Sequence, residues 1–113
     1  MFDFLTPNVP QVDASKLFDA INQKEDMVIL DVRTPGEYAK GKIAGSINLP
    51  VDRVAKEVER IIPDKEKKVY VYCLSGSRSV FAADTMIKLG YKKVFDLKSG
   101  LLYWRVSNFP LEN

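Results

Sequence analysis

Residues 68–90 read KVYVYCLSGSRSVFAADTMIKLG, and this stretch decides the fold. Residues 68–73 are rich in β-branched and aromatic side chains, which is typical of a buried strand. Residues 79–89 return to helical spacing with apolar side chains on one face, and Gly90 suits the end of a helix. A strand that leads through a short loop into an amphipathic helix is typical of α/β proteins.

The same alternation of strands and helices continues on both sides of this stretch. We expect extended segments at residues 27–32, 43–49 and 93–97, and helices at residues 13–24, 35–41, 51–62 and 101–106. Thr34 and Glu37 match a capping box, with Pro35 at the first helical position. The pattern predicts one α/β domain over residues 1–113, with its core at about residues 12–110 and a mainly parallel central sheet flanked by helices on both faces.

The composition narrows the class of protein. Seventeen basic and 15 acidic residues give a net charge of +2, which is too balanced to indicate nucleic acid or an anionic membrane as a partner. No run approaches the ~18 apolar residues of a membrane span. Residues 1–7 lack the basic start and long apolar run of a signal peptide. We therefore expect a protein of the reducing cytoplasm.

The chain contains one cysteine and no histidine. A single cysteine excludes an internal disulfide and any multi-cysteine metal site. The lack of histidine excludes Ser-His-Asp and Cys-His nucleophiles, so any catalysis must run without an imidazole. We expect neither a metal nor another cofactor.

The cysteine, Cys73, ends the predicted strand. The loop that follows it is small and polar and consists of Leu74, Ser75, Gly76, Ser77 and Arg78. Ligands of open α/β sheets bind beyond the carboxyl ends of strands, where a helix N-terminus offers free N–H groups. Gly76 permits the loop to curl so that its N–H groups face the sulfur, and Arg78 adds a positive charge. A lone cysteine is often an inert core residue, but this loop favours a reactive thiolate.

Three blocks of the sequence resemble the signature of rhodanese domains. They are Asp31-Val32-Arg33 with Glu37-Tyr38 and GKIAGSINLP at 41–50, CLSGSRS at 73–79, and Ser99-Gly100 with Trp104 and Pro110. Together they cover about residues 12–110, and the combination is specific. The sequence departs from the family at Lys42, where histidine is common, and at Ser99, where the first of two glycines is usual. The resemblance implies a single rhodanese-like domain.

The resemblance also implies a sulfurtransferase that carries sulfur as a persulfide on Cys73. Rhodanese loops have four residues between the cysteine and the arginine, whereas related phosphatases have five, and this sequence has four. The implied partners are a small sulfur donor such as thiosulfate and a thiol or cyanide acceptor, with a protein as a further candidate acceptor. An ionised thiolate attacking a sulfane sulfur needs no general base, which agrees with the missing histidine.

Other functions remain open at this stage. One is a persulfide carrier or partner-binding module with little turnover of its own. A less favoured one is a phosphatase or arsenate reductase on the same scaffold, and a domain with a dead site is a fourth. The sequence does not specify the donor, the acceptor, the pathway or the oligomeric state.

Residues outside the loop are candidates for support. Asp31 ends its own strand, so it either contacts the loop and orients Arg78 or serves as a turn carboxylate. We expect Arg33 and Glu37 to form a structural ion pair. Tyr103 is a candidate for the rim of the pocket.

Overall fold

A computed structural model describes residues 6–113, and within this range the centre of the protein is a five-stranded sheet. The strands follow the order β1-β5-β4-β2-β3, and every neighbouring pair is parallel. They are β1 (Gln11–Val12), β2 (Met27–Asp31), β3 (Ile47–Asn48), β4 (Lys68–Tyr72) and β5 (Lys93–Leu97). The predicted α/β class is confirmed. The prediction about a signal peptide falls largely on residues 1–5, which lie outside the described residues.

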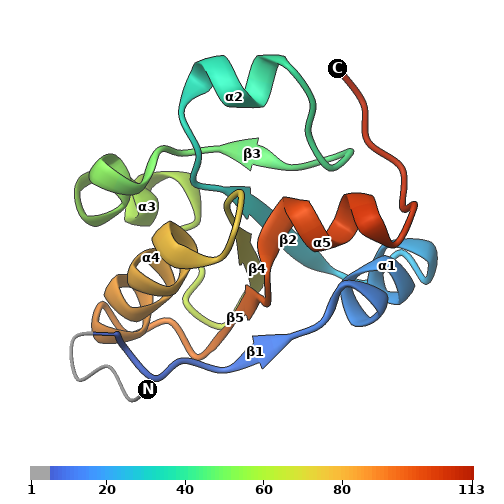
Figure 1. Ribbon diagram of the computed structural model, residues 1–113. Helices are drawn as coiled ribbons and strands as arrows, with labels where there is room; N and C mark the ends of the chain where they lie inside the picture. Colours follow the sequence, from blue (N-terminus) through green and yellow to red (C-terminus); the bar gives the residue numbers. More distant parts are fainter. Residues whose placement is uncertain (1–5) are drawn as a thin grey trace.

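Helices cover both faces of the sheet (Figure 1). Helices α1 (Ala14–Asn22) and α5 (Gly100–Val106) pack on one face, and α3 (Val54–Ile61) and α4 (Ser77–Lys88) pack on the other. The short helix α2 (Pro35–Ala39) lies beyond the edge strand β3. In the described part of the chain, no helix has the length and apolar character needed to cross a bilayer.

Strand β4 lies in the middle of the sheet, and its side chains alternate between the two layers of helices. Val69 and Val71 belong to the apolar cluster under α3 and α4, whereas Tyr70 and Tyr72 belong to the cluster under α1 and α5. All four are fully buried, as expected for a strand covered on both faces. Because successive side chains point to opposite faces, Cys73 points toward the α4 side, and it packs in that cluster.

The structure differs from the sequence prediction at several boundaries. Helix α4 begins at Ser77, two residues earlier than its apolar spacing indicates. Gly76 makes this possible, because its φ of 101° turns the chain directly into the first helical turn. Strand β1 was not expected, since two residues are too short to show a period. It is held by pairing with Asp96 and Leu97 of β5.

The start of α5 lies against the loop that follows Cys73. The N–H groups of Leu101 and Leu102 donate to the carbonyl oxygens of Cys73 and Leu74, both at 3.0 Å. Gly100 has a φ of 53°, and a Cβ atom there would lie 2.5 Å from the Cys73 carbonyl oxygen. Side chains other than hydrogen do not fit at this distance, so the contact between α5 and the loop requires glycine.

We expect Gly100→Ala to lower the free energy of unfolding by about 2–4 kcal/mol, because the added methyl meets rigid backbone and the left-handed φ is strained. Urea denaturation measures this change. Gly36→Ala is the matched control, because a Cβ there meets only the Thr34 Oγ1 at 3.9 Å. It lies within helix α2, where alanine is favoured over glycine by up to about 1 kcal/mol. Equal destabilisation by the two variants would contradict the predicted clash.

Candidate functional site

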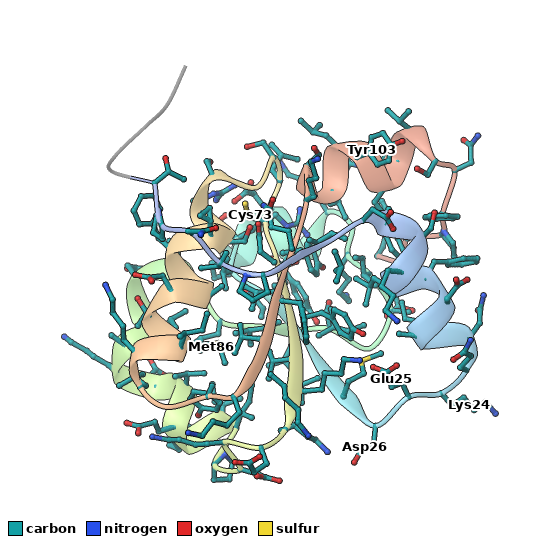
Figure 2. The ribbon with its side chains drawn as sticks, turned by 90° about the horizontal axis from the view of Figure 1, so that it is seen from below. Lys24, Glu25, Asp26, Cys73, Met86 and Tyr103 are labelled. Carbon is teal, nitrogen blue, oxygen red and sulfur yellow. The ribbon has the colours of Figure 1, made fainter. Side chains whose placement is uncertain are left out.

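Cys73 lies at the carboxyl end of the central strand β4. Figure 2 shows its side chain between α4 and α5, at the end of the sheet opposite Glu25 and Asp26. The residue is fully buried and is the only cysteine of the chain. The sulfur is therefore not exposed to solvent.

The sulfur of Cys73 is surrounded by hydrogen-bond donors of the loop and the first turn of α4. The backbone N–H of Gly76 donates to Sγ at 3.1 Å, and that of Ser79 donates at 3.4 Å. The Cys73 thiol itself donates to the Ser79 hydroxyl oxygen at 3.4 Å. The two backbone N–H groups and the positive end of the helix dipole favour negative charge on the sulfur.

The remaining loop side chains stay away from the sulfur. Ser75 and Ser77 are exposed, with their hydroxyls 3.4 Å apart. Leu74 is half-buried against the cluster under α1 and α5. The loop therefore offers its backbone, rather than its side chains, to a ligand, as anion-binding loops do.

Arg78 is held by Glu37 of helix α2. Its Nη1 donates to Oε1 at 2.7 Å and its Nη2 donates to Oε2 at 3.0 Å, which is a bidentate pair. The Arg78 guanidinium lowers the pKa of Glu37 to about 2, and Glu37 in turn raises the pKa of Arg78. Within residues 6–113, Arg78 makes no hydrogen bond to the Cys73 sulfur, and its positive charge lies against the Glu37 carboxylate. Glu37 was not predicted as a site residue, because 41 positions separate the partners.

The predicted ion pair between Arg33 and Glu37 is wrong. Arg33 instead pairs with Asp31, with Nη2 2.7 Å from Oδ2 and Nε 3.1 Å from both oxygens. The Arg33 backbone N–H also donates to Oδ1 at 2.9 Å, so Asp31 is the turn carboxylate of the two alternatives. Both side chains are buried, and a buried charge needs such a partner. Glu37, rather than Asp31, binds and orients Arg78.

A pocket of about 290 Å³ lies beside the loop. It is lined by Asp13, Lys98, Ser99 and Tyr103. Ser99 borders the loop directly, because a Cβ on Gly76 would lie 3.5 Å from the Ser99 nitrogen. Tyr103 therefore lines a pocket next to the site.

A larger cavity of about 500 Å³ lies at the amino end of the strands, far from Cys73. Four of its charged side chains pair with one another: Lys68 with Glu25 at 2.8 Å and Lys67 with Asp26 at 2.5 Å. Among residues 6–113, no three acidic, histidine or cysteine side chains gather as a metal site would require. The chemistry of the described residues is therefore centred on the Cys73 sulfur.

Comparisons with known proteins agree with this fold. The family model for the rhodanese-like domain matches residues 13–107 of this chain. A protein named sulfurtransferase from Allochromatium vinosum is 31% identical over 91% of this chain and 94% of its own length. The thiosulfate sulfurtransferase GlpE of Coxiella burnetii is 35% identical over 74% of this chain and 76% of its own length.

The fold comparison gives the same result. The crystal structure of a rhodanese-related protein from Thermoplasma volcanium superposes with a TM-score of 0.82 at 30% identity, over 92% of this chain and 98% of that one. The sequence family, the relatives and the architecture thus agree over nearly the whole chain. The protein belongs to the rhodanese-like domain family and is a sulfurtransferase by its relationships.

Proposed function

We propose that the protein transfers a sulfane sulfur through a persulfide on Cys73. The observation that carries this proposal is the convergence of the Gly76 and Ser79 N–H groups on the buried Cys73 sulfur. Preorganised donors of this kind stabilise an anion without any reorganisation during the reaction. They are suited to the thiolate, which is the attacking form of cysteine.

The reaction with thiosulfate proceeds in two displacement steps. In the first, the Cys73 thiolate attacks the outer sulfur of thiosulfate, an S–S bond forms to Cys73, and the S–S bond of thiosulfate breaks to release sulfite. In the second, cyanide or a thiolate attacks the outer sulfur of the persulfide, and the Cys73 thiolate leaves. Negative charge is conserved in each step, so no general base is required.

The loop determines where the charge of the persulfide resides. Arg78 contributes little net charge, because Glu37 binds its guanidinium at two points. Stabilisation of the outer sulfur therefore falls to the loop N–H groups and the α4 dipole. Lys98 brings a positive charge and Asp13 a negative charge to the adjacent pocket, where we place a dianionic donor such as thiosulfate against Lys98.

A protein acceptor is the second candidate for the transfer step. Helix α5 presents Leu102, Tyr103 and Val106, which are 49%, 51% and 73% exposed. Apolar side chains on the surface next to a reactive loop suit a protein that receives the sulfur. Such a module would act as a persulfide carrier, in a reducing compartment such as the cytoplasm where its thiol stays free.

A phosphatase is disfavoured by the same geometry. Cysteine phosphatases use the loop arginine to bind the phosphate, whereas Arg78 is bound to Glu37. Only four residues separate Cys73 from Arg78, which leaves a shorter loop. We expect no hydrolysis of an aryl phosphate.

Intact mass spectrometry of the reduced protein tests the persulfide directly. Incubation with thiosulfate should add one sulfur atom (~32 Da), cyanide should remove it, and Cys73→Ala should show neither change, because the thiolate is the acceptor. Stable loading with slow release to small thiols and cyanide would favour the carrier. No gain from thiosulfate, a persulfide or a polysulfide would contradict the proposal.

The ion pair of Glu37 predicts a pH dependence of stability. A carboxyl whose pKa is lowered by folding contributes stability above its unfolded pKa of 4.5, and that contribution is lost as the pH falls toward about 2. Glu37→Gln should therefore cost about 1–2 kcal/mol at pH 7, after allowance for solvent screening of this part-exposed pair. The difference between variant and wild type should shrink between pH 5 and pH 2, as followed by denaturant unfolding.

Asp84→Asn is the control for this measurement. Asp84 pairs with Lys88 one helical turn later on the surface of α4, and such pairs contribute ~0.5 kcal/mol or less. A Glu37→Gln cost that equals that of the control, or that does not change with pH, would show that the pair with Arg78 is not a stabilising one.

A further inference from the structure

Asp96 is a buried carboxyl that the displacement steps do not use. It lies on β5 and is fully buried. Its Oδ2 accepts a hydrogen bond from the Gln11 side chain at 2.9 Å, whereas within residues 6–113 its Oδ1 has no partner at ordinary hydrogen-bond geometry. Burial raises the pKa of Asp96. A buried acidic oxygen without a partner is costly, so its position calls for an explanation.

The sheet places Asp96 on the same side as Cys73. Along β5, Val94 belongs to the cluster under α3 and α4, and Asp96 lies two residues later on the same face. Along β4, Val71 pairs with Asp96, and Cys73 lies two residues further on that face. The carboxyl and the thiol thus point toward the first turn of α4 from neighbouring strands.

Ser79 of α4 stands between these two groups. Its hydroxyl is 3.4 Å from the Cys73 sulfur, and the residue is fully buried. The same hydroxyl interacts with the Asp96 carboxyl and lowers its pKa, at a geometry looser than an ordinary hydrogen bond. A hydroxyl has a single hydrogen, so Ser79 can donate either to the carboxylate or to the sulfur.

We propose that Asp96 is a positioning residue for Cys73, which acts through the Ser79 hydroxyl and shares one proton with the thiol. When Asp96 is ionised, Ser79 donates to the carboxylate and its oxygen accepts the thiol hydrogen. When the thiol proton moves to the Ser79 oxygen, the hydroxyl hydrogen of Ser79 moves to Oδ1. One S–H bond breaks, one O–H bond forms on Asp96, Ser79 remains neutral, and the negative charge moves to the sulfur.

Besides burial, which raises the pKa of Asp96, few groups of residues 6–113 act on its carboxyl. From β1, the facing group is the neutral amide of Gln11; from α4, it is Ser79; and beyond β4, it is the titratable Cys73. The charge of Cys73 acts on Arg78 from a distance, whereas Glu37 of α2 binds Arg78 directly. The inference deepens the proposed sulfur transfer, and it concerns the formation of the attacking thiolate.

The test is the ultraviolet absorbance of the Cys73 thiolate against pH in the full chain, with Cys73→Ala subtracted as the tyrosine background. No sulfur donor is present, so the result is independent of whether persulfide loading succeeds. Two groups that share a proton titrate in two macroscopic steps. The wild type should therefore form its thiolate in two steps, and Asp96→Asn should lose the lower step and titrate in one.

Two further variants make the test specific. Ser79→Ala keeps the carboxyl but removes the link, so it should give a single step shifted to higher pH; it also carries the test if Asp96→Asn does not fold. Glu37→Gln removes a nearby negative charge without touching Ser79, and it should shift the curve but keep two steps. A single step in the wild type, or two steps that survive both Asp96→Asn and Ser79→Ala, would overturn the proposal.

Discussion

The contact between α5 and the loop after Cys73 is the constraint on which the site depends. The first N–H groups of α5 bind the carbonyl oxygens of Cys73 and Leu74, and this close approach requires Gly100. Carbonyl oxygens that faced the sulfur would repel a thiolate. Because these two are held toward α5, the loop can present the N–H groups of Gly76 and Ser79 to the sulfur instead.

Two carboxyl groups near the sulfur have pKa values that are shifted in opposite directions. Glu37 is kept ionised by Arg78, which lowers its pKa, and it offsets the only positive side chain of the loop. Asp96 is buried, which raises its pKa and favours its protonated form. Backbone dipoles are therefore the main groups that face the sulfur, which suits the sulfur anion of the proposed persulfide cycle.

The sequence predicts the parts of the structure that depend on local pattern. The apolar alternation of β4 and the helical spacing after Gly76 are sufficient to place Cys73 at the end of a central strand, next to a helix N-terminus. The pairing of side chains depends on tertiary structure, and the one ion pair predicted from the sequence was wrong. Arg33 binds Asp31 rather than Glu37, since the end of β2 buries Asp31 and demands a partner for it. The sequence pattern did not identify Asp96 as a site residue, because a carboxylate in a short strand is expected to face solvent.

The central claim is that the loop N–H groups hold sulfur on Cys73. A crystal structure of the protein after incubation with a sulfane sulfur donor tests this claim most directly. The account predicts one additional sulfur bonded to the Cys73 Sγ, with its outer face within hydrogen-bond distance of loop N–H groups. A donor-treated crystal with an unmodified Cys73, or an outer sulfur that contacts side chains such as Arg78 but no loop N–H, would contradict it.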